Sequence, residues 1–296
     1  MPSRRAFLQS LGLLAAPFAA GVLHAAGRPG QDAAVAQKTH GPYGLQLYTL
    51  RNQIPKDPSY WFKRIREVGF THVEAAGLYD MTPQVFRQHL DQARLKCDGM
   101  HVMYNLLDQQ FSQVVDTAHT LGVEYVICSW VDLQQRRDLE GWRHVSQTFN
   151  RWAGQLKSQG LKFGYHNHDF EWELFHGEPA MQTLLDNTEP GLVDIEMDVF
   201  WVKRGGQDPV TWLKRYPNRF RLLHLKDMRR STPIGDFWVG NDDENCVPLG
   251  RGILDVRGIL RQAAANGITH AYLEDESKEA PQDLAPSIQY WKNVRI

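Results

Sequence analysis

The stretch that decides the fold reads VVDTAHTLGVEYVICSW and covers residues 114–130. Its first half repeats apolar residues at helical spacing as far as Gly122, and its second half is an apolar run of strand length. Glycine adopts the left-handed backbone conformation that commonly ends a helix. The stretch therefore predicts a helix, a sharp stop and a buried strand.

The same arrangement recurs along the chain. A helical pattern also ends at Gly69, Gly160 and Gly267, each time shortly before another apolar run. We count eight strand-like runs, each followed by a helical pattern: residues 44–49, 72–76, 97–103, 124–130, 162–167, 193–199, 220–226 and 270–274. This alternation is typical of βα units around a parallel sheet, and eight units in about 250 residues favour a single α/β domain, a closed (β/α)8 TIM barrel, over an open sheet. No GxGxxG motif follows the first run, so a dinucleotide site is not indicated.

The first 26 residues have the pattern of an export signal. Ser3-Arg4-Arg5-Ala6-Phe7-Leu8 precedes an apolar run over 11–23 and a small-residue stretch near Ala26, which resembles a twin-arginine signal peptide. We expect cleavage near Ala26, a linker over 27–42, a catalytic domain over 43–296 and a periplasmic location. The apolar run is short for a bilayer span of about 20 residues, so we expect no stable membrane insertion after cleavage, although an uncleaved anchor stays open.

Composition describes one large globular domain. The 296 residues are 42% hydrophobic and 23% charged, and the net charge of -1 offers no basic surface for nucleic acid. Without residues 1–26, which hold two arginines and no acids, 31 basic and 34 acidic residues remain, a net charge of -3. Cys97, Cys128 and Cys246 form no CxxC motif, so we interpret them as packed thiols. Homo-oligomer formation stays open.

Potential metal ligands close four consecutive strands. The fifth ends in YHNHD over 165–169, the sixth in EMD over 196–198, the seventh in HLKD over 224–227 and the eighth in EDE over 274–276. In a TIM barrel the carboxyl ends of the strands surround the active site. A mixture of imidazole and carboxylate groups there predicts one divalent cation: manganese, cobalt, zinc, iron or magnesium.

Several of these segments resemble a known family. The motifs LQLYTLR over 45–51, YHNHDFE over 165–171, DVFW over 198–201, HLKD and LGRGILD over 249–255 are similar to those of the sugar phosphate isomerase/epimerase superfamily, the xylose isomerase-like barrels. The likeness covers essentially all of residues 43–296. It implies that His166, Asp198, His224 and Glu274 hold the metal. Epimerases of this family usually carry Glu where this chain has His166, which resembles the inosose dehydratase type instead.

The residues and the resemblance together support chemistry through an enediolate. Glu274 is the expected base, and His166 or His168 returns the proton or protonates a leaving group. Lys226 either hydrogen-bonds a substrate oxygen or pairs with Asp227. Trp130, Trp201 and Trp238 are placed to stack on a sugar ring, and residues 229–254 form a loop that shapes the site. The candidate substrate-binding residues are Glu74, His101, Trp201, Lys226 and Arg251.

Four functions follow as hypotheses. The favoured one is a metal-dependent isomerase or epimerase of an unphosphorylated keto-sugar or polyol. The alternative is a metal-dependent lyase, acting by dehydration or by β-elimination of a 3-keto-glycoside. A barrel endonuclease is disfavoured because it needs a basic groove and more metal ligands. A non-catalytic sugar-binding barrel is the remaining option.

Overall fold

The computed structural model describes residues 42–235, 237 and 243–296. The expected signal peptide, nearly all of the expected linker and Trp238 lie outside these residues. In the part described, no helix is both long enough and apolar enough to cross a bilayer.

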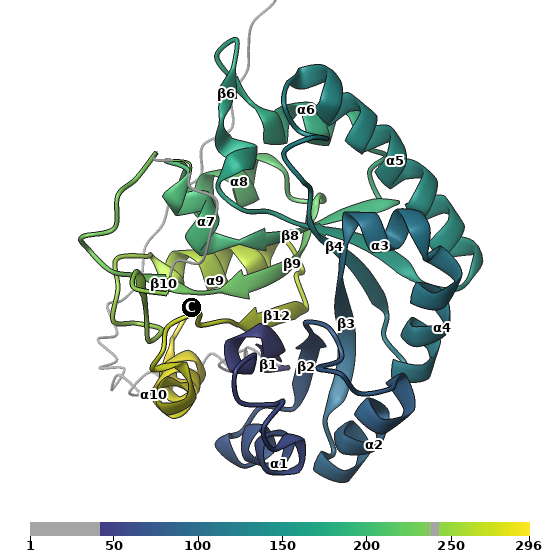
Figure 1. Cartoon of the computed structure of the whole chain (residues 1–296). Coiled ribbons are helices and arrows are strands. Elements are labelled where there is room, and N and C mark those ends of the chain that lie inside the picture. Colours follow the sequence, from purple (N-terminus) through teal and green to yellow (C-terminus); the bar gives the residue numbers. More distant parts are fainter. Residues whose placement is uncertain (1–41, 236, 238–242) are drawn as a thin grey trace, which may run out of the picture. The chain divides into compact units, whose positions relative to one another are not determined.

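Eight parallel strands close into a barrel, which confirms the predicted fold. Figure 1 shows the strands at the centre, with helices outside them. Around the barrel the order is β1, β12, β9, β8, β5, β4, β3 and β2, and β2 pairs with β1 to complete the ring. The strands are β1 (Gly44–Gln46), β2 (His72–Ala75), β3 (Lys96–Met103), β4 (Tyr125–Trp130), β5 (Lys162–His166), β8 (Val193–Asp198), β9 (Phe220–Leu225) and β12 (His270–Leu273).

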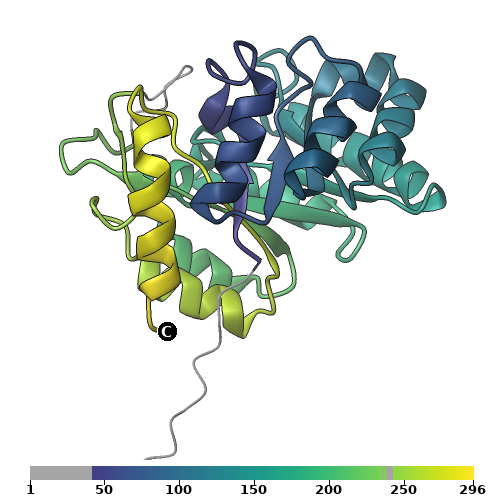
Figure 2. The ribbon, with the colours of Figure 1, turned by 90° about the horizontal axis from the view of Figure 1, so that it is seen from below.

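Helices connect the strands, as the alternating pattern predicts. They are α1 (Pro58–Val68), α2 (Pro83–Ala93), α3 (Tyr104–Gln109), α4 (Phe111–Leu121), α5 (Leu139–Ser158), α6 (Ala180–Asn187), α7 (Val199–Arg204), α8 (Pro209–Arg215), α9 (Val256–Ala265) and α10 (Ala280–Asn293). The last helix, α10, contacts α1, and Figure 2 shows it alongside the early helices of the ring. The remaining elements are η1 (Leu47–Leu50), η2 (Phe170–Trp172), β6 (Leu174–Phe175), β7 (Glu178–Pro179), β10 (Asp227–Met228) and β11 (Cys246–Val247).

The four glycines predicted to end helices have the expected backbone conformation. Gly69, Gly122, Gly160 and Gly267 all have φ between 69° and 118°, in the left-handed region. Gly69 and Gly122 are the C-cap residues of α1 and α4. Strand β1 is the main difference, since residues 47–50 turn into a 3₁₀ helix because the Gln46 side chain accepts a hydrogen bond from Tyr48 N.

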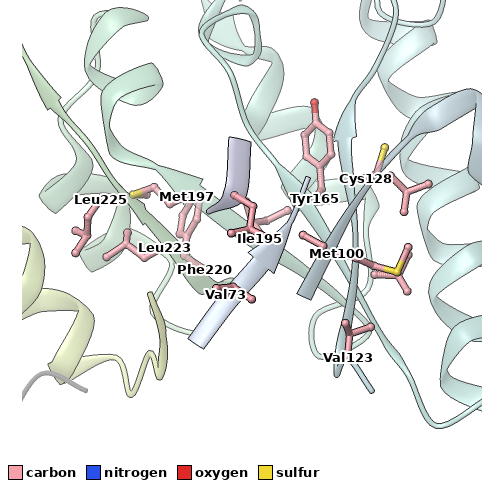
Figure 3. Packing of buried hydrophobic residues seen from close by; sticks show 14 of the residues in the cluster. Val73, Met100, Val123, Cys128, Tyr165, Ile195, Met197, Phe220, Leu223 and Leu225 are labelled. Carbon is pink, nitrogen blue, oxygen red and sulfur yellow. The ribbon is translucent and has the colours of Figure 1, made fainter. Parts of the chain in front are cut away.

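Strand alternation divides the apolar residues between two layers. One face of each strand packs against the helices, and Figure 3 shows Met197, Leu223 and Leu225 in this outer core. The barrel interior holds a small separate cluster made of Tyr125, Ile127, Leu222 and Tyr272. Gly99 and Gly164 make room for it, because a Cβ atom on either would lie 3.0 Å from the Ile127 side chain. The three cysteines are buried and free, as expected.

Candidate metal centre and active site

Inside the barrel, a cluster of polar side chains lies next to the small apolar cluster described above. On β8 and β9 the side chains of Glu196, Asp198 and His224 follow the inward-facing period of two. The other members come from the ends of neighbouring strands, and all are buried or nearly so. The cluster comprises Glu74, His101, His166, Glu196, Asp198, His224, Lys226, Glu274 and Glu276.

Two sets of described side chains lie close enough to share one ion. One set is Asp198, His224 and Glu274; the other is His101, His166, Glu196 and His224. Within each set the donor atoms lie within 4.8 Å of one another. The orientation of the His166 and His224 rings decides between them.

In both His166 and His224, the two ring nitrogens face different carboxylates. His224 Nδ1 lies 2.7 Å from Glu274 Oε2 and 4.0 Å from Asp198 Oδ2, whereas its Nε2 lies 2.7 Å from Glu74 Oε2. His166 Nε2 lies 3.9 Å from Asp198 Oδ2, and its Nδ1 lies 3.1 Å from Glu196 Oε2. Ligating histidines usually direct their second nitrogen at a carboxylate that orients the ring. Glu74 and Glu196 therefore suit the orienting role.

Of the four predicted ligands, Asp198, His224 and Glu274 form one of these sets, whereas His166 belongs to the other set and lies 3.9 Å from Asp198. Donor atoms about 2.0–2.2 Å from one ion lie roughly 3 to 4.4 Å from one another. The separations of 3.9 and 4.0 Å around Asp198 fit that range, and His224 Nδ1 and Glu274 Oε2 are hydrogen-bonded at 2.7 Å. Imidazole nitrogen and carboxylate oxygen suit a divalent transition metal or magnesium.

Asp198 is held in place by the helix that follows it. Its Oδ1 accepts hydrogen bonds from the backbone N–H groups of Phe200 and Trp201, at 2.9 and 3.1 Å, and so caps α7. Asn167 Oδ1 accepts from Asp198 N at 3.1 Å, which ties the end of β5 to the end of β8. These contacts leave Asp198 Oδ2 directed at the cluster, where Lys226 Nζ lies 3.0 Å away.

The electrostatics of the cluster favour positive charge. Burial lowers the pKa of His101, but Glu74 and Glu196 raise it more, to about 9. Burial also opposes a charged His224, yet the neighbouring carboxylates hold its pKa well above the usual value. Burial alone would raise the pKa of Glu274, but Lys226 and His224 hold it well below its ordinary range. The cluster holds five buried carboxyl groups, of which three contact the single ammonium group, so it is a suitable setting for a further cation.

Lys226 connects three carboxylates. Its Nζ lies 3.0 Å from Asp198 Oδ2, 3.1 Å from Glu274 Oε2 and 2.5 Å from Glu276 Oε1. Asp227 instead accepts hydrogen bonds from the backbone N–H groups of Met228, Gly250, Gly252 and Leu254. Lys226 thus pairs with Asp198, Glu274 and Glu276 and not with Asp227, the protein partner that the sequence suggests for it.

His168 lies at the rim of the barrel and is surrounded by aromatic side chains. Its ring stacks on Phe170 at 5.4 Å and an interplanar angle of 8°, with Trp130 4.8 Å and Trp201 5.5 Å away. Its backbone N–H donates to Glu171 Oε2 at 2.9 Å. Burial, reinforced by His166, holds the pKa of His168 well below the usual value, so its imidazole is neutral at neutral pH.

A cavity of about 740 Å³ opens over the cluster. The predicted site residues that line it are His101, His166, His168, Trp201, Lys226 and Glu274, together with Trp130. Glu74 is fully buried beneath it and hydrogen-bonds His224 at 2.7 Å. Arg251 is exposed in the turn after β11 and is not part of the described cavity wall. The structure therefore does not bring Arg251 together with the other candidates.

Glu196 and Glu276 contribute to the site, although the sequence did not lead us to predict them as site residues. Glu196 contacts His101, His166 and His224 at 2.8–3.1 Å, and Glu276 lines the cavity. Both stand two residues from a predicted ligand, Asp198 or Glu274. On β8 the period of two is the signal that could have identified Glu196, because it shares the inward face with Asp198. Glu276 follows β12 in a loop, so no strand period applies to it.

The fold and site define the class of protein as a closed parallel TIM barrel with candidate metal ligands at its strand ends. The chain matches the Xylose isomerase-like TIM barrel family over residues 62–294, and it belongs to that family.

Named relatives include both lyases and isomerases. Inosose dehydratase of Geobacillus kaustophilus (strain HTA426) is 25% identical over 192 residues, which are 55% of this chain and 59% of that protein. The chain thus matches less than two thirds of that relative's length. A crystal structure of a sugar phosphate isomerase/epimerase from Parabacteroides distasonis ATCC 8503 is 25% identical, with a TM-score of 0.70, and the match covers 89% of this chain and 97% of that one.

A third relative is similar in its fold. The crystal structure of IOLI protein with a binding zinc atom has a TM-score of 0.68 and covers 86% of this chain and 96% of that one. At 15% identity the likeness shows the shared barrel alone. The chain thus has the barrel fold of a family whose named relatives include a sugar phosphate isomerase/epimerase and an inosose dehydratase.

Proposed function

We propose that the protein is a metal-dependent lyase that removes water by β-elimination from a keto-sugar or keto-polyol. The observation that carries the proposal is the arrangement of Glu274 and Glu276, which both line the cavity and both contact Lys226 Nζ, at 3.1 and 2.5 Å. The end of β5 and the loop after it contribute His166 and His168 to the cavity instead of a carboxylate. The inosose dehydratase relative supports the same interpretation.

The residues present fit a divalent cation. His166 Nε2, Asp198 Oδ2, His224 Nδ1 and Glu274 Oε2 would hold it, with Glu74 and Glu196 orienting the two rings. When bound, such an ion polarises a substrate carbonyl group and stabilises the negative charge that develops on its oxygen. The metal is one of manganese, cobalt, zinc, iron or magnesium.

The carboxylates would move the protons. Glu274 takes a proton from the carbon next to the carbonyl group, the C–O bond at the neighbouring carbon breaks, and its electron pair leaves with the oxygen. Glu276, whose pKa is raised by burial, starts in its protonated form and gives that proton to the oxygen, so that water and an unsaturated ketone are formed. Lys226 lies between the two carboxylates and can return the proton from Glu274 to Glu276, which restores the starting state. His168 is positioned at the rim to hydrogen-bond a substrate hydroxyl.

The isomerase or epimerase hypothesis, which the sequence favoured, uses the same first proton transfer. Its two-base form needs a second base on the opposite face of the carbon atom, and family epimerases supply a Glu where this chain has His166. Two observations support the lyase at least as well as the isomerase. They are the relative named inosose dehydratase and the residues of the cavity wall. We therefore place the isomerase second.

Proton NMR in deuterated water separates the two reactions. The full chain, loaded with manganese, is incubated with inosose, after which the products are compared with those of the Glu274→Gln variant. We expect an unsaturated product that has lost water, and at least a roughly 1000-fold lower rate in the variant. A recovered epimer that carries deuterium, with no unsaturated product, contradicts the lyase and favours the isomerase.

We also propose that residues 1–26 direct twin-arginine export to the periplasm, on the basis of the sequence pattern alone. Replacing both Arg4 and Arg5 with Lys is expected to hold the protein in the cytoplasm of a bacterial host. Cell fractionation with immunodetection measures the outcome. Equal periplasmic amounts of the native and variant chains contradict the proposed route.

A further inference from the structure

The cavity has an apolar branch, defined here as the part lined by Leu78, Met100, Val102, Met103, Leu106 and Val114. Met100 and Val102 alternate with His101 along β3, and they belong to the outer core rather than to the barrel interior. Val114 and Thr117, one helical turn apart on α4, line the same cavity. Because α4 packs outside β3 (Figure 1), the cavity reaches from the polar cluster past the end of β3 toward α4.

The cavity as a whole is larger than a single sugar ring needs. A six-carbon cyclic polyol has roughly twelve non-hydrogen atoms, and even at the liquid volume of a water molecule, about 30 Å³ for each, it fills less than half of such a space. The whole cavity has about 740 Å³. That volume lies in the range of about 300–1,000 Å³ typical of sites for larger organic ligands.

The chemistry of the wall changes along the cavity. At one end lie His166, Lys226, Glu274 and Glu276; at the other, the six apolar side chains. The polar residues near the branch are Gln110, Gln113, Thr117 and Ser129, of which the two glutamines are exposed. Met103 and Leu106 keep 41% and 38% of their surface exposed. Large exposed apolar side chains beside a pocket are typical of a ligand-binding surface.

We propose that the apolar branch holds an aryl or alkyl group attached to the substrate ring, so that the substrates are glycosides with an apolar aglycone rather than free monosaccharides. This assignment rests on the proposed function for the polar end of the cavity. The ring oxygens face the carboxylates and the candidate metal ligands, while the apolar group lies against β3, α3 and α4. Burial of that group supplies affinity through the hydrophobic effect.

Binding of a series of glucosides tests the branch without requiring turnover. Methyl, n-butyl and n-hexyl glucoside are titrated into the full chain by calorimetry in the presence of manganese. Each methylene group buried in the branch is expected to raise the affinity about fourfold. Leu106→Asp and Met103→Gln, at exposed positions of the branch, are expected to reduce this gain at least threefold for n-hexyl glucoside relative to methyl glucoside.

Leu174→Gln is the matched control, because Leu174 is 58% exposed and is not among the residues that line the described cavity. It is expected to keep the native gain. Equal affinities along the series, no detectable binding, or a gain that Leu106→Asp and Met103→Gln leave unchanged overturns the proposal. If inosose and the 3-keto form of n-hexyl glucoside both fail to undergo elimination while the gain persists, the proposed reaction is wrong and the branch stands. If elimination occurs without the gain, only the assignment of the branch to an aglycone is wrong.

Discussion

Glu196 is the residue through which the barrel interior orients the proposed metal ligands. It lies within 3.1 Å of three histidine side chains, and His166 and His224 are among them. Removing its charge should weaken the contacts that orient both rings. We expect Glu196→Gln to weaken zinc or manganese binding about 10- to 100-fold, as measured by calorimetry.

Asp194→Asn is the control for this prediction. Asp194 stands two residues earlier on the same strand, and its Oδ2 accepts a hydrogen bond from Tyr125 at 2.8 Å, away from the ligand set. Its substitution is expected to leave metal affinity unchanged. If Glu196→Gln binds metal as tightly as the native chain, Glu196 has no orienting role.

Glu171 gives the fold a dependence on pH. Burial raises its pKa to about 8, although hydrogen bonds from Tyr165 and the His168 backbone N–H lower it in part. Between about pH 4.5 and 8 the folded chain therefore holds a proton that the unfolded chain has released. The stability associated with this proton is present below about pH 4.5 and is lost as the pH rises to about 8.

Glu171→Gln should remove that dependence. Urea unfolding at about pH 5 and about pH 8.5 should show a smaller loss of stability in the variant than in the native chain. The difference should amount to a few kcal/mol at most, at about 1.4 kcal/mol for each pKa unit. Identical losses in both proteins would show that Glu171 is ionised in the fold throughout this range.

At the scale of elements, the loop after β11 depends on Asp227. The carboxylate accepts four backbone hydrogen bonds, three of them from Gly250, Gly252 and Leu254. A Cβ atom on Gly252 would lie 2.2 Å from Asp227 Oδ1 and 2.4 Å from Met228 O. The LGRGILD motif is thus explained by close approach of the backbone to this carboxylate.

Gly252→Ala is expected to lower the free energy of unfolding by about 1–3 kcal/mol because the added methyl group overlaps Asp227. Gly154→Ala is the comparison, since a methyl group added to Gly154, inside α5, would meet no described atom within 4 Å beyond the backbone of its own helix. Alanine there should stabilise the helix by up to about 1 kcal/mol. Urea denaturation measures both variants. Equal stability of Gly252→Ala and the native chain would refute the close contact.

The elements themselves were largely predictable from the sequence. Each barrel strand overlaps its expected run to within a few residues, because a buried parallel strand is a continuous apolar run and the four glycine stops mark helix ends. The end of β1 was not predictable in this way. Leu47 and Leu50 continue the apolar pattern, but the Gln46 side chain caps a 3₁₀ turn, a local contact that hydrophobic spacing does not encode.

At the scale of the whole molecule, closure of the barrel brings the candidate site residues to one rim. His166, Asp198, His224 and Glu274 were predicted to meet because they all follow strand ends, and parallel strands in a barrel end at one rim. Arg251 was chosen from a motif position, and a motif does not tell which way a loop side chain points. The apolar branch was also beyond the sequence, since it depends on the packing of α4 against β3.

Metal binding should stabilise the entire barrel. An ion that binds only the folded chain raises stability by about 2.7 kcal/mol at a concentration about 100 times its dissociation constant. We therefore expect manganese or zinc to raise the melting temperature of the metal-free protein by several degrees, and a chelator to reverse the rise. A melting temperature that no divalent ion changes would argue for a barrel without a metal function.

The position of a bound ion tests the central claim most directly. Crystals of the full chain soaked in manganese or zinc are measured by anomalous diffraction. We predict one anomalous peak about 2.0–2.3 Å from His166 Nε2, Asp198 Oδ2, His224 Nδ1 and Glu274 Oε2. No peak in the barrel, or a peak held by His101 and Glu196 while Lys226 still bridges Asp198 and Glu274, would contradict the account.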